Sequence, residues 1–169
     1  MGTIESRKNV LLLLRALKSL KSDLPVIVVG KATPYLKTLT DYIIANGLER
    51  RVSFIHNAAF ADLPSIYGLA KVFVYPSLFE GFGIPIVEAI SCEVPVITSQ
   101  GSCFSEAGGP DCLYVDTKNP EQLADAIMSV LSNEVKSTEM VVKSKKYVEQ
   151  FEPKVIASHL MECYRDLIL

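Results

Sequence analysis

The fold of this chain is decided by PSLFEGFGIPIVEA, residues 76–89. The run before it, Val72–Tyr75, is short, apolar and rich in β-branched and aromatic residues, as in a buried parallel strand. Two glycines let the backbone turn sharply and approach a ligand, and Pro85 suits the first turn of a helix. A strand, a glycine loop and a helix start together gather free N–H groups around an anion. The predicted phosphate contacts are the backbone N–H groups of Gly81, Phe82, Gly83 and Ile84.

Two carboxylates, Glu80 and Glu88, flank this loop. Carboxylates repel phosphate, but they are strong acceptors for hydroxyl groups. A phosphate in the middle with hydroxyls on both sides describes a nucleotide-sugar. For Glu88 the residues alone leave a second interpretation open, a surface glutamate early in a helix that the helix dipole stabilises.

The spacing of these two glutamates, with seven residues between them, resembles the E-x7-E motif of retaining glycosyltransferases of the GT-B fold. The nearest type is glycosyltransferase group 1, family 4, and the resemblance covers nearly the whole chain. It corresponds to the C-terminal, donor-binding domain, one half of a two-domain enzyme. The resemblance implies that Glu80 contacts the donor sugar and that Glu88 holds the ribose hydroxyls.

Further apolar runs alternate with helical patterns along the chain, which predicts a doubly wound, mainly parallel, Rossmann-like α/β sheet. Ligands bind at the carboxyl ends of strands in such sheets, so we expect Gly30 and Asn57 at the ligand edge. His56 lies there too, although a lone histidine is more often structural. The expected strands are 25–30, 52–55, 72–75, 94–98 and 113–115.

Helix boundaries follow from capping residues and apolar spacing. A turn over 101–106 is expected to open a short helix, and the apolar face of the last helix is expected to be partly exposed. Two helices are expected from Val10 to Leu20 and from Tyr35 to Asn46, the second ended by Gly47. Two more are expected to begin after capping residues Asp62 and Asn119. The last two are expected over 141–151 and 155–169.

Arg7 and Lys8 precede the first helix, where the helix dipole disfavours cations. They are either two solvated basic residues or a phosphate clamp. The segment GTIESRKN, residues 2–9, resembles the phosphate-binding segment of the family, and Lys8 matches its diphosphate-binding lysine. The family often carries an arginine where this chain has Thr3, so Arg7 is a candidate substitute. In the family this segment follows a strand, so we expect the first strand of the domain to be missing from residues 1–169.

The composition is that of a globular domain, with 49% apolar residues, 21% charged residues and a formal net charge of −2. It indicates no nucleic-acid surface, which would need clustered basic charge. The four cysteines show no metal-ligand spacing and indicate reduced thiols in a cytoplasmic protein. No Asp-x-Asp sequence occurs, so neither a chelated metal nor a cofactor is predicted.

Together these features predict the donor half of a hexosyltransferase-type enzyme that uses a UDP-sugar, a GDP-sugar or a similar nucleotide-diphosphate sugar. Lys8 and Glu80 are the expected catalytic residues. The acceptor, a sugar or glycolipid, would bind a missing N-terminal domain, so the isolated chain is expected to be inactive. The resemblance also allows peripheral membrane association of the full-length enzyme. The alternatives are a nucleotide- or sugar-phosphate-binding regulatory module and a GT-B nucleotide-sugar epimerase.

Overall fold

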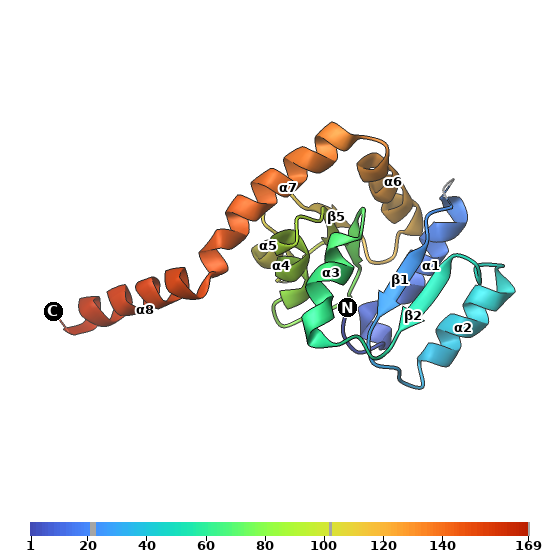
Figure 1. Ribbon diagram of the computed structural model, residues 1–169, viewed down its shortest axis with the longest axis horizontal. Coiled ribbons are helices and arrows are strands. Elements are labelled where there is room, and N and C mark those ends of the chain that lie inside the picture. The colour runs from blue at the N-terminus through green and yellow to red at the C-terminus, as the bar shows by residue number, and fades with distance from the viewer. Residues whose placement is uncertain (21–22, 102, 169) are drawn as a thin grey trace.

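The computed structural model describes residues 1–20, 23–101 and 103–168 (Figure 1). Short parallel strands lie at its centre and helices pack around them. The elements in chain order are the 3-10 helix η1 (Ser6–Lys8), α1 (Val10–Ser19), β1 (Val26–Val29), α2 (Leu36–Ala45), β2 (Val52–Ile55), the 3-10 helix η2 (Phe60–Asp62), α3 (Leu63–Gly68), β3 (Phe73–Tyr75), α4 (Ile84–Ser91), β4 (Val96–Ser99), α5 (Phe104–Gly108), β5 (Leu113–Val115), α6 (Pro120–Leu131), α7 (Glu134–Val148), the 3-10 helix η3 (Glu149–Phe151) and α8 (Pro153–Ile168).

All the described strand pairs are parallel, which confirms the predicted α/β class. β1 pairs with β2, with Val26 opposite Val52, and β4 lies between β3 and β5. The strands thus form a two-stranded and a three-stranded sheet rather than one continuous sheet. All four residues of β4 are buried, because this strand has a neighbour on each edge and helices over its faces.

Two apolar clusters form the core. The first joins α1, α2 and α6 through fully buried residues such as Leu14, Leu39 and Leu123. The second packs α4 and α5 against β3 and β4, with Ile86 and Phe104 fully buried. The second cluster fixes the start of α4, and therefore the glycine loop that precedes it.

Capping residues set several helix boundaries as predicted. Asn119 accepts a hydrogen bond from the Gln122 amide at 2.9 Å, so α6 begins at Pro120. Gly47, with φ of 64°, follows the end of α2. The cap predicted at Asp62 is wrong. This residue ends η2 in helical backbone conformation and forms no side-chain capping bond, whereas a cap needs extended dihedrals.

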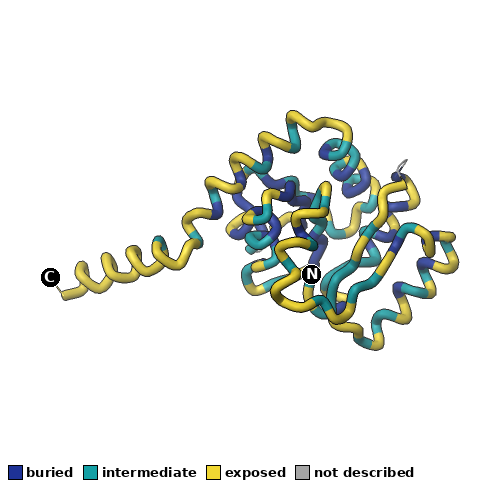
Figure 2. The backbone as a smooth tube through the Cα atoms, viewed as in Figure 1, coloured by how far each residue is buried: buried dark blue, intermediate teal, exposed yellow. Residues whose placement is uncertain are grey.

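The two C-terminal helices differ from the predicted ranges. α7 begins at Glu134 instead of Val141, because Asn133 accepts a hydrogen bond from the Lys136 amide and starts the helix in a polar stretch. α7 ends at Val148, and α8 then projects away from the rest of the molecule with none of its residues buried (Figure 2). This confirms an exposed apolar face on the last helix. The predicted end of that helix, Leu169, lies outside the described residues, as does Ser102 in the predicted 101–106 turn.

No helix within the described ranges has both the length and the apolar character that crossing a membrane requires.

Candidate functional site

The glycine loop leaves the carboxyl end of β3 and opens α4. Tyr75 ends the strand, and Ser77 below the loop is fully buried. Gly83 has a φ of 103°, a left-handed conformation that suits glycine, and α4 begins at the next residue with Pro85 in its first turn. The predicted strand, glycine loop and helix start are confirmed, and the positive end of α4 faces the loop.

The Glu80 carboxylate forms ion pairs with two basic side chains of the N-terminal segment, one at each oxygen. Lys8 Nζ lies 2.6 Å from Glu80 Oε1, and Arg7 Nη1 lies 2.9 Å from Oε2. Lys8 Nζ also donates to the hydroxyl of Tyr75 at 2.7 Å and lies 5.0 Å from the centre of its ring. Arg7 Nε donates to Glu5 at 2.9 Å. The structure thus brings the predicted Glu80, Lys8 and Arg7 together across more than 70 residues of sequence.

This ion cluster is partly shielded from water. The side chains of Lys8 and Glu80 are 12% and 10% exposed, whereas that of Arg7 is 44% exposed. Burial alone would raise the pKa of Glu80, but hydrogen bonds from Lys8 and Arg7 outweigh it and hold that pKa below its ordinary value. Burial, followed by the nearby Glu80 carboxylate, raises the pKa of Tyr75 above its ordinary value. Glu80 is therefore ionised and Tyr75 neutral at neutral pH.

Glu88 lies in the second turn of α4 and is half-buried. Its Oε2 accepts a hydrogen bond of 2.7 Å from the hydroxyl of Tyr67 on α3, a residue that is only 3% exposed. Burial, and then this hydrogen bond, raises the pKa of Tyr67 above its ordinary value. A partly buried carboxylate held by a buried hydroxyl fits a binding residue better than a solvated surface glutamate.

Lys8, Glu88 and Glu80 all act electrostatically on the amino group of Met1. Burial lowers the pKa of this amino group to about 6, Lys8 lowers it further, and Glu88 and Glu80 oppose the shift. All three side chains thus lie within electrostatic reach of one point. The two ends of the predicted site, one on each side of the glycine loop, belong to a single region.

Other predicted residues stand at the edge of this region. Both backbone groups of Gly30 have protein partners, since its amide donates to Ile55 O at 2.9 Å and its carbonyl lies 2.9 Å from His56 Nδ1. A side chain at Gly30 would collide with the Gly2 carbonyl. His56 also stacks on Phe54, which favours its structural interpretation. Asn57 is exposed in the loop after β2.

The ring of the predicted Phe82 packs edge-to-face on Phe151 at 5.2 Å, so only the backbone of Phe82 remains a candidate contact. Other residues of the region were not predicted. Cys103 Sγ donates to the Glu80 carbonyl at 3.3 Å. Tyr75, as the last residue of a central strand, could have been identified from its position, because strand ends carry ligand residues in such sheets. No sequence pattern indicated Tyr67, because its contact with Glu88 depends on how α3 packs against α4.

Comparison with known proteins adds independent evidence on the family of this chain. A family model described as glycosyl transferases group 1 matches residues 1–149. O-antigen chain mannosyltransferase B of Escherichia coli is 33% identical over 137 residues, which cover 79% of this chain and 36% of that protein. O-antigen chain mannosyltransferase RfbU of Salmonella typhimurium is 34% identical over 136 residues, which cover 75% of this chain and 38% of that protein. The chain spans well under half the length of these curated relatives.

Solved structures agree. The C-terminal domain of LpcC, a glycosyl transferase group 1 family protein from Francisella tularensis, has a TM-score of 0.78 and 26% identity, and the match covers 89% of this chain and 82% of that one. Anabaena Alr3699/HepE, solved in complex with UDP and glucose, shares the fold with a TM-score of 0.88 at 24% identity, over 98% of this chain and 47% of that one. The resemblance found in the sequence is confirmed. The chain belongs to the glycosyl transferases group 1 family and corresponds to its C-terminal, GT-B-type domain.

Proposed function

We propose that the site binds a nucleotide-diphosphate sugar, and that the protein, with an N-terminal domain, transfers the glycosyl group to an acceptor with retention of configuration. The observation that carries this proposal is the Glu80 carboxylate clamped by Arg7 and Lys8 beside the open start of α4. Two cations, a carboxylate and the positive end of a helix meet there at the carboxyl edge of parallel strands, an arrangement suited to a phosphate with hydroxyl groups beside it. Membership of the family supports the same reaction class.

Transfer breaks the bond from sugar C1 to a diphosphate oxygen and leaves negative charge on the diphosphate. An ammonium group has three donors, and Lys8 uses two of them on Tyr75 and Glu80, so one is open to a phosphate oxygen. Arg7 uses Nε and Nη1 and keeps further N–H groups open. With the backbone N–H groups at the start of α4, these donors would stabilise the leaving group.

The carboxylates would bind the two sugars. Glu88 Oε2 accepts a hydrogen bond from Tyr67, and in this proposal its other oxygen would accept one from a ribose hydroxyl. Glu80 would orient the donor sugar and stabilise positive charge on its ring. UDP-glucose is the first donor to test, because one structural relative was solved in complex with it. GDP-mannose is the second, because two relatives are mannosyltransferases.

In this proposal the acceptor, a sugar or glycolipid, binds the N-terminal domain, and the enzyme works in the cytoplasm. The 169-residue chain alone should bind the donor and transfer nothing, because cleft closure between two domains brings the reacting atoms together. Robust turnover by this chain with a panel of sugar acceptors would contradict the two-domain part of the proposal.

Calorimetric titration with UDP and with uridine tests the phosphate site. Lys8→Ala should weaken UDP binding far more than uridine binding, and the lost increment should shrink at high salt because it is electrostatic. Lys154→Ala, an exposed lysine on α8, is the matched control and should change neither affinity. Equal losses for UDP and uridine would remove Lys8 from the phosphate site.

Titration of Glu88→Ala tests the ribose site. Loss of a charged acceptor should weaken UDP binding by roughly 1.5–3 kcal/mol. Glu162→Ala, an exposed glutamate on α8, should bind UDP as the unmodified chain does. An affinity that Glu88→Ala leaves unchanged would return Glu88 to the surface-glutamate interpretation.

A further inference from the structure

Ser77, between β3 and the glycine loop, carries a buried hydroxyl to which the proposed reaction gives no role. The residue is fully buried, and its Oγ forms no hydrogen bond with any residue that the structure describes. Buried polar groups are normally paired, because a hydroxyl taken out of water without a partner is costly. The Ser77 hydroxyl therefore needs a partner close to its present position.

The backbone around Ser77 is held in place from two sides. The Ser77 carbonyl accepts a hydrogen bond of 2.7 Å from the hydroxyl of Ser99, the last residue of β4. The next amide, that of Leu78, donates to the Arg7 carbonyl of η1 at 2.8 Å. Ser77 is thus tied to the central strand and to the segment that carries the two cations. Rotation of the side chain, and not movement of the residue, would bring the hydroxyl to a partner.

Two acceptors lie within electrostatic reach of this hydroxyl, the Glu80 carboxylate and the Tyr75 hydroxyl. Burial raises the pKa of both groups, and the Ser77 hydroxyl opposes that effect in both, as a donor to the charged form does. One O–H group can donate to only one of them at a time. Because Glu80 is ionised at neutral pH and Tyr75 is neutral, the carboxylate is the stronger acceptor. Charge therefore directs the Ser77 hydroxyl to Glu80.

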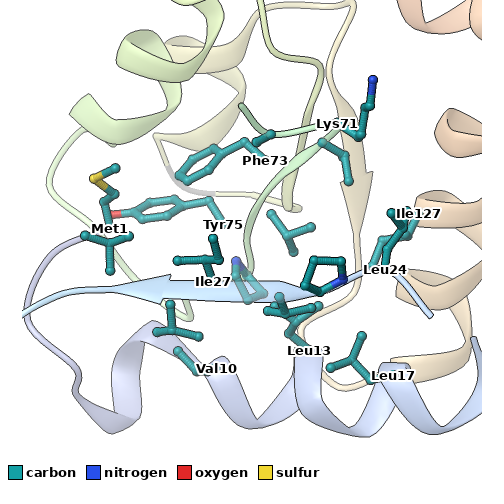
Figure 3. Close-up of a pocket in the computed structure, with 18 of the residues that line it drawn as sticks. Met1, Val10, Leu13, Leu17, Leu24, Ile27, Lys71, Phe73, Tyr75 and Ile127 are labelled. Atoms are coloured by element: carbon teal, nitrogen blue, oxygen red, sulfur yellow. The ribbon is translucent and has the colours of Figure 1, made fainter. Parts of the chain in front are cut away.

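Other titratable groups face Glu80 from several segments of the chain. They are Lys8 and Arg7 of η1, Tyr75 at the end of β3, the thiol of Cys103, which donates to the Glu80 carbonyl, and the amino group of Met1, a residue that lines a cavity of about 300 Å³ together with Tyr75 (Figure 3). Among them Lys8 and Arg7 are paired with the carboxylate. A bound diphosphate would share these two cations and bring negative charge of its own. Both effects would raise the pKa of Glu80 and loosen its carboxylate.

We propose that Ser77 is a positioning residue for Glu80, whose carboxylate its buried hydroxyl holds toward the donor sugar while a bound diphosphate shares Lys8 and Arg7. This inference rests on the proposed function, which supplies the diphosphate and the sugar. Ser77 is fully buried, so it acts through Glu80 and not by touching the donor. Its hydroxyl carries no charge that a phosphate would attract, and it stays with the carboxylate when the cations are shared.

Carbon-13 NMR titration of the Glu80 carboxyl group tests the hydrogen bond directly, with Glu80→Gln used to assign the resonance. Ser77→Ala should raise the pKa of Glu80 in the free chain, and the difference from the unmodified chain should be larger when UDP is bound. Ser144→Ala removes the hydroxyl of another buried serine, on α7, and should leave the Glu80 pKa unchanged. A Glu80 pKa that Ser77→Ala leaves unchanged, while UDP still binds, would overturn the inference.

Calorimetry separates the sugar from the nucleotide. Because Glu80 contacts the donor sugar in the proposed site, Ser77→Ala should weaken UDP-glucose binding about three- to tenfold and UDP binding less than about twofold. Equal losses for the two ligands would overturn the positioning role. Ser77→Cys keeps the size of the side chain and donates weakly, so it should change the pKa and the affinity in the same direction by less. It supplies both measurements if Ser77→Ala does not fold.

Failure of the inference and failure of the proposed function give different results. An unmodified chain that bound neither UDP nor GDP would contradict the proposed function. The titration of the free chain would then decide the hydrogen bond between Ser77 and Glu80 on its own, since it needs no ligand.

Discussion

At the scale of single residues, the hydrogen bond from Tyr67 to Glu88 fixes the direction of a carboxylate. The two residues lie on neighbouring helices, α3 and α4, and the bond of 2.7 Å occupies one oxygen of Glu88. Tyr67 is itself only 3% exposed. Its role in our proposed site is to position Glu88.

Tyr67→Phe removes the hydroxyl and keeps the packed ring. We expect UDP affinity to fall by about 0.5–1.5 kcal/mol, the usual worth of one hydrogen bond. Affinity for 2′,3′-dideoxy-UDP should stay the same, because this ligand has no ribose hydroxyls for Glu88 to bind. Tyr164→Phe on α8 is the control. Equal losses for both ligands would indicate a general effect on the fold, not a positioning role.

The ion cluster on Glu80 predicts a pH dependence of stability. The pKa of Glu80 is lowered in the folded state, because hydrogen bonds from Lys8 and Arg7 outweigh the opposing effect of burial. A lowered folded-state pKa gives stabilisation that is complete above the unfolded value of about 4.3 and is lost as the pH falls through the folded value.

Urea unfolding of the unmodified chain and of Glu80→Gln measures this contribution. The difference in unfolding free energy should be constant from about pH 7 to about pH 5 and should shrink below about pH 4. Glu139→Gln, an exposed glutamate 3.9 Å from Lys143, should show a much smaller difference across the range. A Glu80→Gln difference that grows on acidification would have the wrong sign for this explanation.

At the scale of elements, the contact between Gly30 and Gly2 joins the end of β1 to the N-terminal segment. Gly30→Ala would place a methyl group 1.6 Å from the Gly2 carbonyl, so residues 1–4 would have to move. We expect the unfolding free energy to fall by about 1–3 kcal/mol, as overpacked sites do. Gly68→Ala, at the end of α3 with nothing within 4 Å, should lie within about 1 kcal/mol of the unmodified chain. Equal unfolding free energies in urea for both variants would contradict the contact.

Elements with a strong local signal were predictable. The strands are short apolar runs, α6 has a capping asparagine, and the glycine loop has its own residue types, so each follows from local physics. The start of α7 was missed because Glu134 begins a polar stretch where apolar spacing is weak and the Asn133 cap is the main indication. The contacts of Tyr67 with Glu88 and of Tyr75 with Lys8 were missed because they join residues 21 and 67 positions apart, although the place of Tyr75 at a strand end was visible in the sequence. Such pairs depend on tertiary packing, which local patterns do not contain.

At the scale of the whole molecule, α8 stands apart from the rest. It projects from the body, and its apolar residues Ile156, Leu160 and Tyr164 are 45–57% exposed (Figures 1 and 2). Deleting residues 153–169 should therefore change the unfolding free energy of the body by less than about 0.5 kcal/mol in urea titration. A substantially larger loss would show that α8 supports the body. The full-length chain with Leu160→Ala is the control, and its unfolding free energy should equal that of the unmodified chain.

The solitary position of α8 also determines how the molecule responds to heat. A helix of 16 residues that buries no side chain is near the length at which isolated helices are marginal in water. It should lose its structure gradually, well below the temperature at which the packed body melts in one cooperative step. Circular dichroism at 222 nm would then show a sloping decline before the main transition, while calorimetry would record almost all of the heat in that transition. The chain should therefore melt in two parts of very unequal size, one gradual and one cooperative, although it forms one continuous polypeptide.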